Sequence, residues 1–368
     1  MIRVVTAEVM ALRLPLKNPV RMSVGTITSA ECLIVRLTDT EGREGWGEAA
    51  SAPSMTGDFI EGMFAAGRYL AERCKGAEIV EAAQVPTVLN AALYRNNGVK
   101  AAFEIAILDL LGQERGLPLS ELLGRRQRDS VPVLRMVAGE SLDEEISEAR
   151  AAADAGFSMF KIKVGVGPPE ADLARCTAIR RALGPGVQIS ADANGGYDLP
   201  AALIFARGAE DAGLDFIEQP VAADNLLGVA ATAAATDVPI CADEGIHELK
   251  DIRAHFEAKA ASGGSLKLIK LGGPLAVMQA GRLLHHLGMS VNLAGKIAET
   301  SIASAALSHV AIALPQLDWG TSVTHQYLAD DITETPLTLT GGSLSPTEGS
   351  GLGVQPCREK LERYKLVI

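Results

Sequence analysis

Short apolar runs alternate with longer, Ala-rich amphipathic stretches from about residue 129 to residue 342. The unit of one apolar run and one amphipathic stretch repeats about every 25 residues, which is the length of a strand, a helix and two loops. We count about eight such strands, from 131–136 to 317–319, and that number closes a barrel. The pattern predicts an α/β fold with a (β/α)7β barrel of the TIM type.

The first part of the chain has a different pattern. Alternation from Val4 to Leu14 and the apolar run at 32–37 predict antiparallel strands. Residues 101–113 are apolar at most positions, which predicts a largely buried helix. Two polar, glycine-containing segments, at 21–26 and 51–57, are expected to be loops. We therefore expect an α+β capping domain at 1–128, completed by 343–368, and the barrel at 129–342.

Charged residues stand at the carboxyl ends of five of the predicted barrel strands. Alternation along residues 160–164 places two lysines on one face of a strand, opposite three apolar side chains. Two ammonium groups on a buried strand are costly unless carboxylates face them. The polar residues at these strand ends are Lys161 and Lys163, Asp192 with Asn194, Glu218, Asp243 with Glu244, and Lys267. Such ends meet at one mouth of a barrel, where active sites lie.

Carboxylates on three neighbouring strand ends, without histidine or cysteine, favour a hard cation. We expect Asp192, Glu218 and Asp243 to bind one Mg²⁺, or Mn²⁺ in its place. Lys163 and Lys267 would flank that ion from opposite sides. This arrangement suits removal of a proton next to a substrate carboxylate, with the lysines as base and acid. Glu244 is expected to point away from Asp243 and to have a supporting or substrate-orienting role.

Each of these groups, taken alone, also has a structural interpretation, because strand-end acids often cap helices and most lysines are solvated. Five groups in one order favour an active site. Two other classes of protein are a non-catalytic binder and a barrel metal hydrolase. The hydrolase requires histidine ligands that the strand ends lack, and the binder would not need every catalytic position. Zinc in the purified protein would indicate the hydrolase, and absence of metal dependence the binder.

The amino-acid composition disfavours some classes of binding partner. The 368 residues include 34 basic and 45 acidic ones, and a net charge of −11 disfavours nucleic acid and anionic membranes. The sequence contains neither an apolar run of membrane-spanning length nor a signal-peptide pattern. Its 5 cysteines are scattered without metal-type spacing, so we expect reduced thiols. We expect a cytoplasmic homo-oligomer that acts on a small carboxylate.

These motifs resemble those of the enolase superfamily, and within it the muconate-lactonizing enzyme subgroup. Residues 101–112 are similar to a helix of that subgroup's capping domain, and Lys161-Ile162-Lys163 is similar to its Lys-x-Lys strand. The resemblance implies that Lys163 is an acid/base residue, Lys267 the opposing lysine, and the three carboxylates the metal ligands. A mandelate racemase would have a histidine after the seventh strand, where 290–296 has none. His285 and His286 precede that strand and are interpreted as surface residues.

The resemblance also implies that the segments 21–26 and 51–57 cover the barrel mouth. We expect substrate contacts from Met22, Ser23, Met55 and Thr56 in these segments. Where the family has Met-Leu-Glu-x-x-x-Gly, the chain reads Ile-Ala-Glu-Thr-Ser-Ile-Ala at 297–303, so Glu299 is kept and the glycine is not.

Two further residues have open interpretations. Lys296 points either into the site or to solvent. Trp319 is either a substrate contact at the mouth or a core or interface residue.

Residues 291–306 and 317–332 look most like the cis-3-hydroxy-L-proline dehydratases of this subgroup. That resemblance implies a cyclic amino acid as substrate and Δ1-pyrroline-2-carboxylate as product, with possible exchange of the proline α-proton. The alternatives are a racemase or epimerase of amino acids or dipeptides, and a muconate cycloisomerase.

Overall fold

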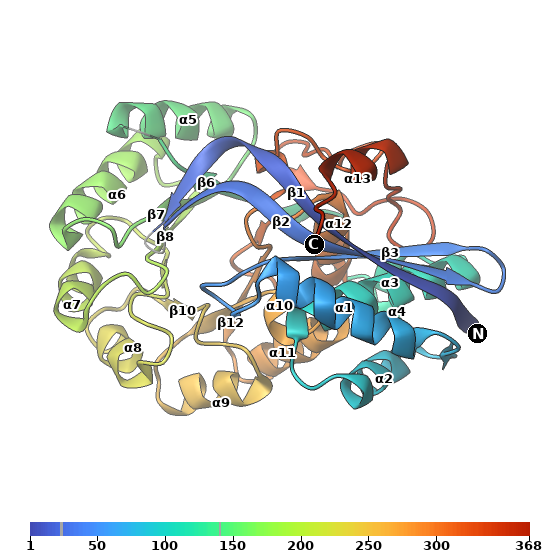
Figure 1. Cartoon of the computed structure of the whole chain (residues 1–368). Helices are drawn as coiled ribbons and strands as arrows, with labels where there is room; N and C mark the ends of the chain where they lie inside the picture. Colours follow the sequence, from blue (N-terminus) through green and yellow to red (C-terminus); the bar gives the residue numbers. More distant parts are fainter. Residues whose placement is uncertain (23–24, 140) are drawn as a thin grey trace.

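Eight parallel strands form one sheet in a computed structural model that describes residues 1–22, 25–139 and 141–368 (Figure 1). A bridge between Val133 and Thr321 joins the first strand region to the last, so the sheet closes into the predicted (β/α)7β barrel. The strands are β6 (Leu134–Val137), β7 (Met159–Lys163), β8 (Gln188–Asp192), β9 (Phe216–Glu218), β10 (Ile240–Ala242), β11 (Gly263–Leu266), β12 (Ser290–Ala294) and β13 (Thr321–Ser322).

Helices connect these strands and cover the outside of the barrel (Figure 1). They are α5 (Leu142–Asp154), α6 (Pro169–Leu183), α7 (Leu199–Gly208), α8 (Leu226–Ala233), α9 (Leu249–Glu257), the short α10 (Leu268–Leu271), α11 (Pro274–His286) and α12 (Ser301–Ala313). Helix α5 is capped by Ser141, whose side chain accepts the N–H of Glu144 at 3.3 Å. None of the helices in the described ranges is long and apolar enough to cross a membrane.

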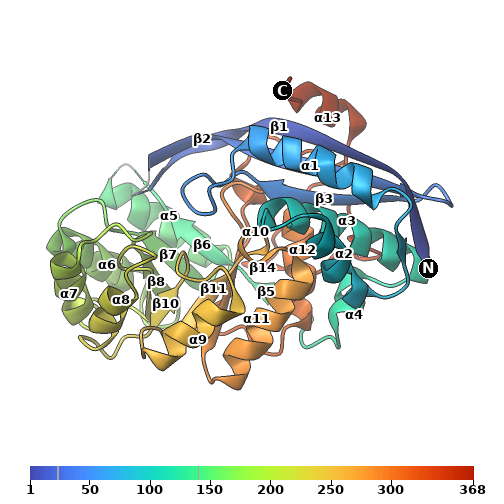
Figure 2. The same ribbon diagram turned by 60° about the horizontal axis from the view of Figure 1, so that its bottom comes forward.

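A second, antiparallel sheet lies on one side of the barrel together with four helices (Figure 2). Its strands are β1 (Ile2–Met22), β2 (Gly25–Asp39), β3 (Glu44–Ala50) and β4 (Glu78–Ile79), and the helices are α1 (Ile60–Cys74), α2 (Val85–Ala92), α3 (Asn97–Arg115) and α4 (Leu119–Leu123). Helix α3 is buried from Gly98 to Gly112, as predicted. Its backbone approaches β3 so closely that a Cβ at Gly47 would lie 1.8 Å from the Ala102 carbonyl oxygen, so β3 requires glycine there.

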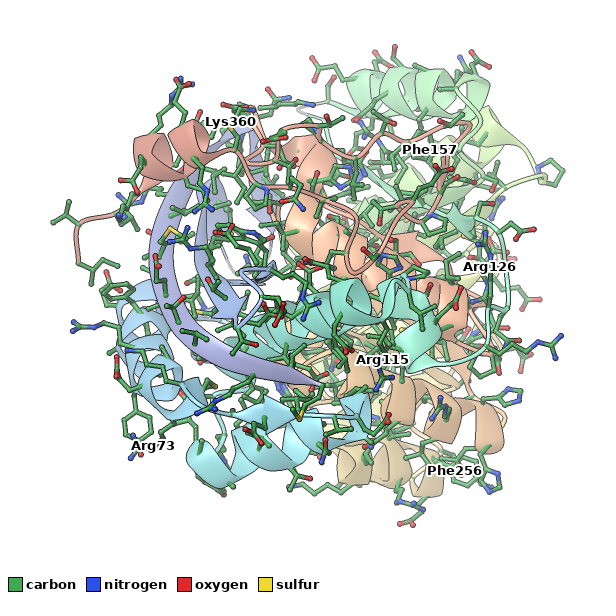
Figure 3. The ribbon with its side chains drawn as sticks, turned by 90° about the vertical axis from the view of Figure 1, so that its right-hand side faces the viewer. Arg73, Arg115, Arg126, Phe157, Phe256 and Lys360 are labelled. Atoms are coloured by element: carbon green, nitrogen blue, oxygen red, sulfur yellow. The ribbon has the colours of Figure 1, made fainter. Side chains whose placement is uncertain are left out.

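The C-terminal segment contacts both the barrel region and the first sheet. Strand β14 (Ser343–Leu344) pairs with β5 (Val131–Pro132), and α13 (Arg358–Tyr364) packs against β1. Lys360 on α13 donates to Asp330 Oδ1 at 2.7 Å and so ties this helix to the loop after β13 (Figure 3). The domain limits at 128 and 343 stay a prediction.

Three boundaries differ from the sequence-based expectation. The segment 21–26 is not simply a loop: β1 continues to Met22 and β2 starts at Gly25, with Arg21 opposite Thr26. The strand expected at 131–136 is divided between β5 and β6 because its first residues pair with β14. The last strand, expected at 317–319, lies at 321–322, and 317–319 instead lead into it from the opposite end of the barrel.

Two buried glutamates of the first domain fix it to the barrel. Glu48 on β3 accepts the N–H and hydroxyl of Thr300 at 2.8 and 2.5 Å and the N–H of Ala303 at 3.0 Å, at the start of α12. Glu104 on α3 accepts the N–H of Leu275 at 2.7 Å, in the first turn of α11. Helix N-termini expose N–H groups that lack partners within the helix, so these two acceptors stabilise the domain interface.

We expect Glu48→Ala to lower the free energy of unfolding by about 2–4 kcal/mol, because three buried donors lose their acceptor. Urea denaturation followed by circular dichroism measures this change. The control is Glu8→Ala, which removes an exposed partner of Arg36 and should cost less than about 1 kcal/mol. Equal effects of the two substitutions would contradict the assignment of Glu48 as a domain-fixing residue.

Candidate active site

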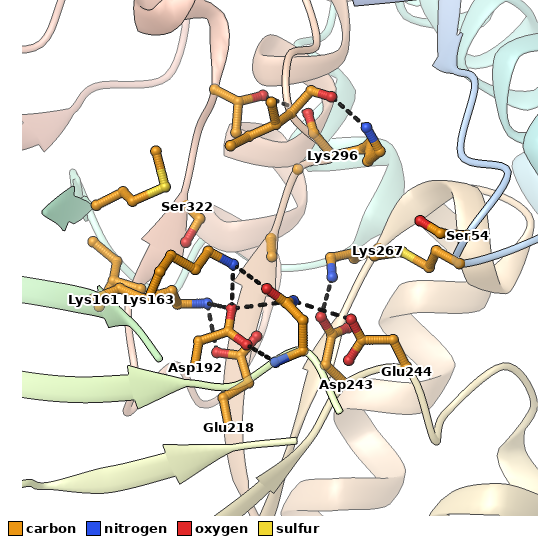
Figure 4. A pocket seen from close by; sticks show the side chains of 18 of the residues that line it. Ser54, Lys161, Lys163, Asp192, Glu218, Asp243, Glu244, Lys267, Lys296 and Ser322 are labelled. Atoms are coloured by element: carbon orange, nitrogen blue, oxygen red, sulfur yellow. Dashed lines mark hydrogen bonds and ion pairs between the residues drawn. The ribbon is translucent and has the colours of Figure 1, made fainter. Parts of the chain in front are cut away.

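The predicted strand-end residues gather around one cavity of about 300 Å³ at the carboxyl end of the barrel (Figure 4). The expected site residues that line it are Met55, Lys161, Lys163, Asp192, Asn194, Glu218, Asp243, Glu244, Lys267 and Lys296. The barrel register explains this convergence, because Lys163, Asp192 and Glu218 are neighbours across β7, β8 and β9.

Lys163 and Asp192 form an ion pair at one side of the cavity. The Lys163 ammonium donates to Asp192 Oδ2 at 2.6 Å and to Asn194 Oδ1 at 2.8 Å, and the Asn194 N–H donates to Asp192 Oδ1 at 2.9 Å. Asn194 has a left-handed backbone with φ of 44°, which asparagine tolerates better than most residues. Burial alone would raise the pKa of Asp192, but Lys163 and Lys161 outweigh it and hold the pKa below its ordinary value.

Lys161 lies deeper in the barrel, between two carboxylates. Its ammonium donates to Glu218 Oε2 at 2.5 Å and lies 3.7 Å from Asp192 Oδ2. Burial alone would lower the pKa of Lys161, but Glu218 and Asp192 raise it, so this lysine stays charged. Burial and the nearby Asp192 raise the pKa of Glu218 to about 7, against the effect of Lys161.

Asp243 is held by two lysines. Lys267 donates to its Oδ2, and Lys270 donates to its Oδ1 at 2.6 Å and to the carbonyl of Ser265 at 3.0 Å. Burial alone would raise the pKa of Asp243, yet the two lysines lower it. Lys270 was not predicted as a site residue, although its position three residues after Lys267 would indicate one shared helix face. The residues after Leu266 form α10 and do not continue the strand.

Lys163 and Lys267 approach the cavity from opposite sides (Figure 4). Strands β7 and β11 are separated by β8, β9 and β10 in an eight-stranded barrel, so their ends face each other across the mouth. Between them, Asn194 Nδ2 donates to Glu244 Oε1 at 3.1 Å. Glu244 lines the same cavity as Asp243, so the expectation that it points away is wrong.

The donor set matches the chemistry of a hard divalent cation. Its donors are carboxylate oxygens, and buried Glu244 Oε2 has no hydrogen-bond partner among the described residues. Over the described ranges, no three His, Cys, Asp or Glu side chains are grouped as tightly as a bound ion would hold them. The Lys161 ammonium lies between Asp192 and Glu218 instead. These carboxylates therefore fit Mg²⁺ by donor type, and the lysines compensate their charge.

The segment after β12 forms the remaining charged wall. Lys296 lines the cavity and donates to the carbonyl of its neighbour Ile297 at 2.5 Å. Glu299 is buried beneath it: a Cβ at Gly295 would lie 2.5 Å from Glu299 Oε2. Burial and the carboxylate of Glu48 raise the pKa of Glu299 to about 8. The charged form of Glu299 is therefore disfavoured near pH 7.

Several expected contacts lie elsewhere. Trp319 is in the core, where it stacks on Phe216 with ring centroids 4.4 Å apart, so the interpretation as a mouth residue is wrong. Thr56 donates to Asp58 Oδ2 at 2.7 Å and lines a neighbouring cavity. Ser23 and the side chain of Met22 lie outside the described residues. His285 and His286 are exposed, as expected.

Other lining residues were missed by sequence reasoning. They are mostly small or apolar: Ser54, Leu134, Met136, Gly195, Ala222, Ala223, His247, Ala294, Gly295, Ile297, Ser322, Val323, Thr324 and Tyr327. Apolar residues carry no chemical signal, and only their place just after a strand end could have indicated them. His247 lies after Glu244 in the segment between β10 and α9, and its Nε2 lies 3.0 Å from the Glu244 carbonyl oxygen.

Comparison with known families matches both parts of the chain. Residues 144–360 match a family described as enolase C-terminal domain-like. Residues 4–124 match the mandelate racemase/muconate lactonizing enzyme N-terminal domain.

Characterised relatives of similar length include three isomerases. The chain is 29% identical to the N-succinyl-L-Arg/Lys racemase of Bacillus cereus, over 84% of each chain. It is 30% identical to the L-Ala-D/L-Glu epimerase of Bacillus subtilis, over 96% of each. It is also 30% identical to muconate cycloisomerase 1 of Pseudomonas putida, over 95% of this chain and 94% of that one.

Solved structures share the whole fold. Muconate lactonizing enzyme from Pseudomonas fluorescens, complexed with muconolactone, superposes with a TM-score of 0.93 at 28% identity over 99% of each chain. A dipeptide epimerase from Cytophaga hutchinsonii, complexed with Mg and D-Ala-L-Val, gives 0.91 at 26% identity over 99% of this chain and 98% of that one.

We expect Glu299→Gln to flatten the pH dependence of stability. The folded-state pKa of about 8 lies above the ordinary value of 4.5. The contribution of Glu299 to the free energy of unfolding is therefore fully present below pH 4.5 and is lost as the pH rises through 8. Melting temperatures from pH 4.5 to 9 should therefore agree at the acidic end and favour the variant at the basic end. Parallel pH profiles would contradict this assignment, and exposed Glu81→Gln is the control.

Proposed function

Because the chain belongs to the enolase superfamily, in its mandelate racemase/muconate lactonizing enzyme group, we propose that it removes the α-proton of a small carboxylate substrate with the help of Mg²⁺. The opposed pair of Lys163 and Lys267 supports this proposal most directly. Each lysine ends at the cavity, and each comes from a different side of the barrel (Figure 4).

The two lysines are the proposed base and acid. One of them, with a free electron pair on Nζ, takes the α-proton, and the C–H electrons move into the substrate carboxylate to form an enediolate. The other lysine, as an ammonium, donates a proton to the opposite face of the α-carbon. The product has the inverted configuration, and the lysines have exchanged their protonation states.

The carboxylates opposite the substrate complete the proposed site. Asp192, Glu218 and Asp243 would hold Mg²⁺, as their donor chemistry suits this ion. When bound, Mg²⁺ would offset the negative charge that develops on the substrate carboxylate and weaken the hold of these carboxylates on the lysine protons. Asn194 keeps Lys163 and Asp192 aligned through its hydrogen bonds to both.

Racemisation or epimerisation of an amino-acid derivative is the outcome we favour. Proton transfer at the two faces of the α-carbon requires no proton-transferring group besides the two lysines, and the three relatives named above are isomerases. Dehydration of cis-3-hydroxy-L-proline is the second candidate. This substrate is a cyclic amino acid, as the resemblance of residues 291–306 and 317–332 implies. Its α-hydrogen and hydroxyl lie on opposite ring faces, so the same pair could supply base and acid for an anti elimination.

A substrate panel separates these outcomes. The enzyme, MgCl₂ and D₂O are incubated with amino acids, dipeptides, N-succinyl amino acids, cis,cis-muconate, and cis- and trans-3-hydroxy-L-proline. Deuterium at the α-carbon with a mixture of stereoisomers indicates racemisation or epimerisation, and lactone formation from muconate indicates cycloisomerisation. A cyclic imine from cis-3-hydroxy-L-proline alone indicates the dehydratase. Absence of α-deuterium and product from every member would contradict the proposal.

We expect Lys163→Ala and Lys267→Ala each to slow turnover by at least about a hundredfold, because each removes one of two proton-transferring groups. The distinguishing measurement is α-proton exchange from each enantiomer separately. Each variant should lose exchange from the enantiomer whose proton faces the missing lysine. Exchange of both enantiomers at the parent rate in either variant would remove that lysine from the mechanism.

We expect Asp192→Asn to weaken Mg²⁺ binding and abolish turnover, since it removes one carboxylate charge and the Lys163 ion pair. Chelation of the parent protein with EDTA should have the same effect on activity and be reversed by added Mg²⁺. Calorimetric titration of Mg²⁺ checks the binding directly. Full activity in excess chelator would show that no exchangeable metal is involved.

A further inference from the structure

We infer that Lys296 binds a second carboxylate of the substrate, remote from the reacting carbon. The inference rests on the proposed function for the position of the first carboxylate. It narrows the substrate class to dicarboxylates, such as amino acids whose nitrogen carries an acyl group that ends in a carboxylate.

The position of Lys296 defines this subsite. Lys296 follows β12 and lines the cavity on the side away from the floor that Asp192, Glu218 and Asp243 form (Figure 4). A carboxylate substrate that reacts between Lys163 and Lys267 therefore extends its far end toward Lys296. The apolar residues that line the same cavity include Met136, Ile297 and Val323.

Lys296 differs from the other lysines of the site in its partners. Lys161, Lys163, Lys267 and Lys270 each lie within 4.0 Å of a carboxylate oxygen. Among the described residues, no carboxylate lies that close to the Lys296 ammonium, which donates to the carbonyl of Ile297. A half-buried ammonium with only a neutral acceptor gains most from an anion.

The nearest acid in sequence does not supply that anion. Glu299 is buried beneath Gly295 rather than in the cavity, and it is close enough to Glu48 for the two carboxylates to repel. Glu299 forms no ion pair with Lys296 among the described residues, and its raised pKa disfavours the charged form that could compensate this lysine.

The charge balance of the occupied site leads to the same substrate class. The floor matches four carboxylates with four ammonium groups: Asp192, Glu218, Asp243 and Glu244 with Lys161, Lys163, Lys267 and Lys270. In the proposed reacting state one of Lys163 and Lys267 is uncharged, so a dication and one substrate carboxylate bring the floor to neutrality, and Lys296 leaves one positive charge. A second substrate carboxylate reduces this excess, whereas a free α-ammonium would add to it. A masked nitrogen is therefore favoured over a free amino acid.

A matched ligand pair tests the subsite without turnover. N-succinylglycine carries the second carboxylate, and its terminal amide has the same shape without that charge. Calorimetry with the Mg²⁺-loaded protein should show the dianion binding about tenfold to a hundredfold more tightly than the amide, as expected for a charge-assisted hydrogen bond. Lys296→Gln should remove this preference, and Lys296→Arg should keep most of it.

The control is Lys250→Gln, at an exposed position of α9. This variant should bind both ligands as the parent protein does. Melting temperatures establish that each variant is folded. Equal affinity of the parent for both ligands, no binding of either, or an undiminished preference in folded Lys296→Gln overturns the inference.

The reaction is scored separately from the subsite. Dianion preference without α-deuterium incorporation would overturn the proposed function and leave the subsite in place. Incorporation of α-deuterium without any preference for the dianion would overturn the subsite and support the proposed function.

Discussion

Mutual compensation of buried charge is the constraint on which this barrel mouth depends. Four ammonium groups and four carboxylates lie close together there, and removal of Asp192, for example, leaves Lys163 without a carboxylate within 4.0 Å among the described residues. The parallel register supplies the solution, because it brings the ends of neighbouring strands side by side: Lys163 pairs with Asp192 across β7 and β8, and Lys161 with Glu218 two strands away. The same network of ion pairs that makes burial tolerable also fixes the direction of each lysine ammonium.

The sequence was informative where one rule acts on many residues. Alternating apolar and amphipathic stretches predict a closed barrel, and β6 to β13 confirm it. Charged residues at strand ends were expected to converge, and the cavity contains Lys163, Asp192, Glu218, Asp243 and Lys267 together. Such predictions succeed because strand direction and register place all carboxyl ends at one mouth, whatever the detailed packing.

The errors occurred where a single side chain had to be oriented. Trp319 precedes β13 rather than ending a strand, and this shift of a few residues moves it from the mouth to a stack on Phe216. Glu244 turns back to Asn194 because a hydrogen bond, which no pattern shows, favours that direction. Lys270 was overlooked because α10 is a single helical turn inside an apolar stretch that has the pattern of a continued β11. Local backbone geometry and side-chain partners decide such positions, and they are set by tertiary structure.

The anchoring of α12 by Glu48 has a consequence for how such enzymes diverge. Glu48 binds the N-terminal end of α12, and the segment just before that helix holds Lys296 and Glu299. The contact between the two domains is therefore adjacent in sequence to one wall of the cavity. A substitution in β3 that moves Glu48 would shift that wall of the cavity, although β3 itself would not contact the ligand. The two domains should therefore be inherited as a matched pair, and a chimera that combines the cap of one relative with the barrel of another would inherit the chemistry of its barrel but the selectivity of neither parent.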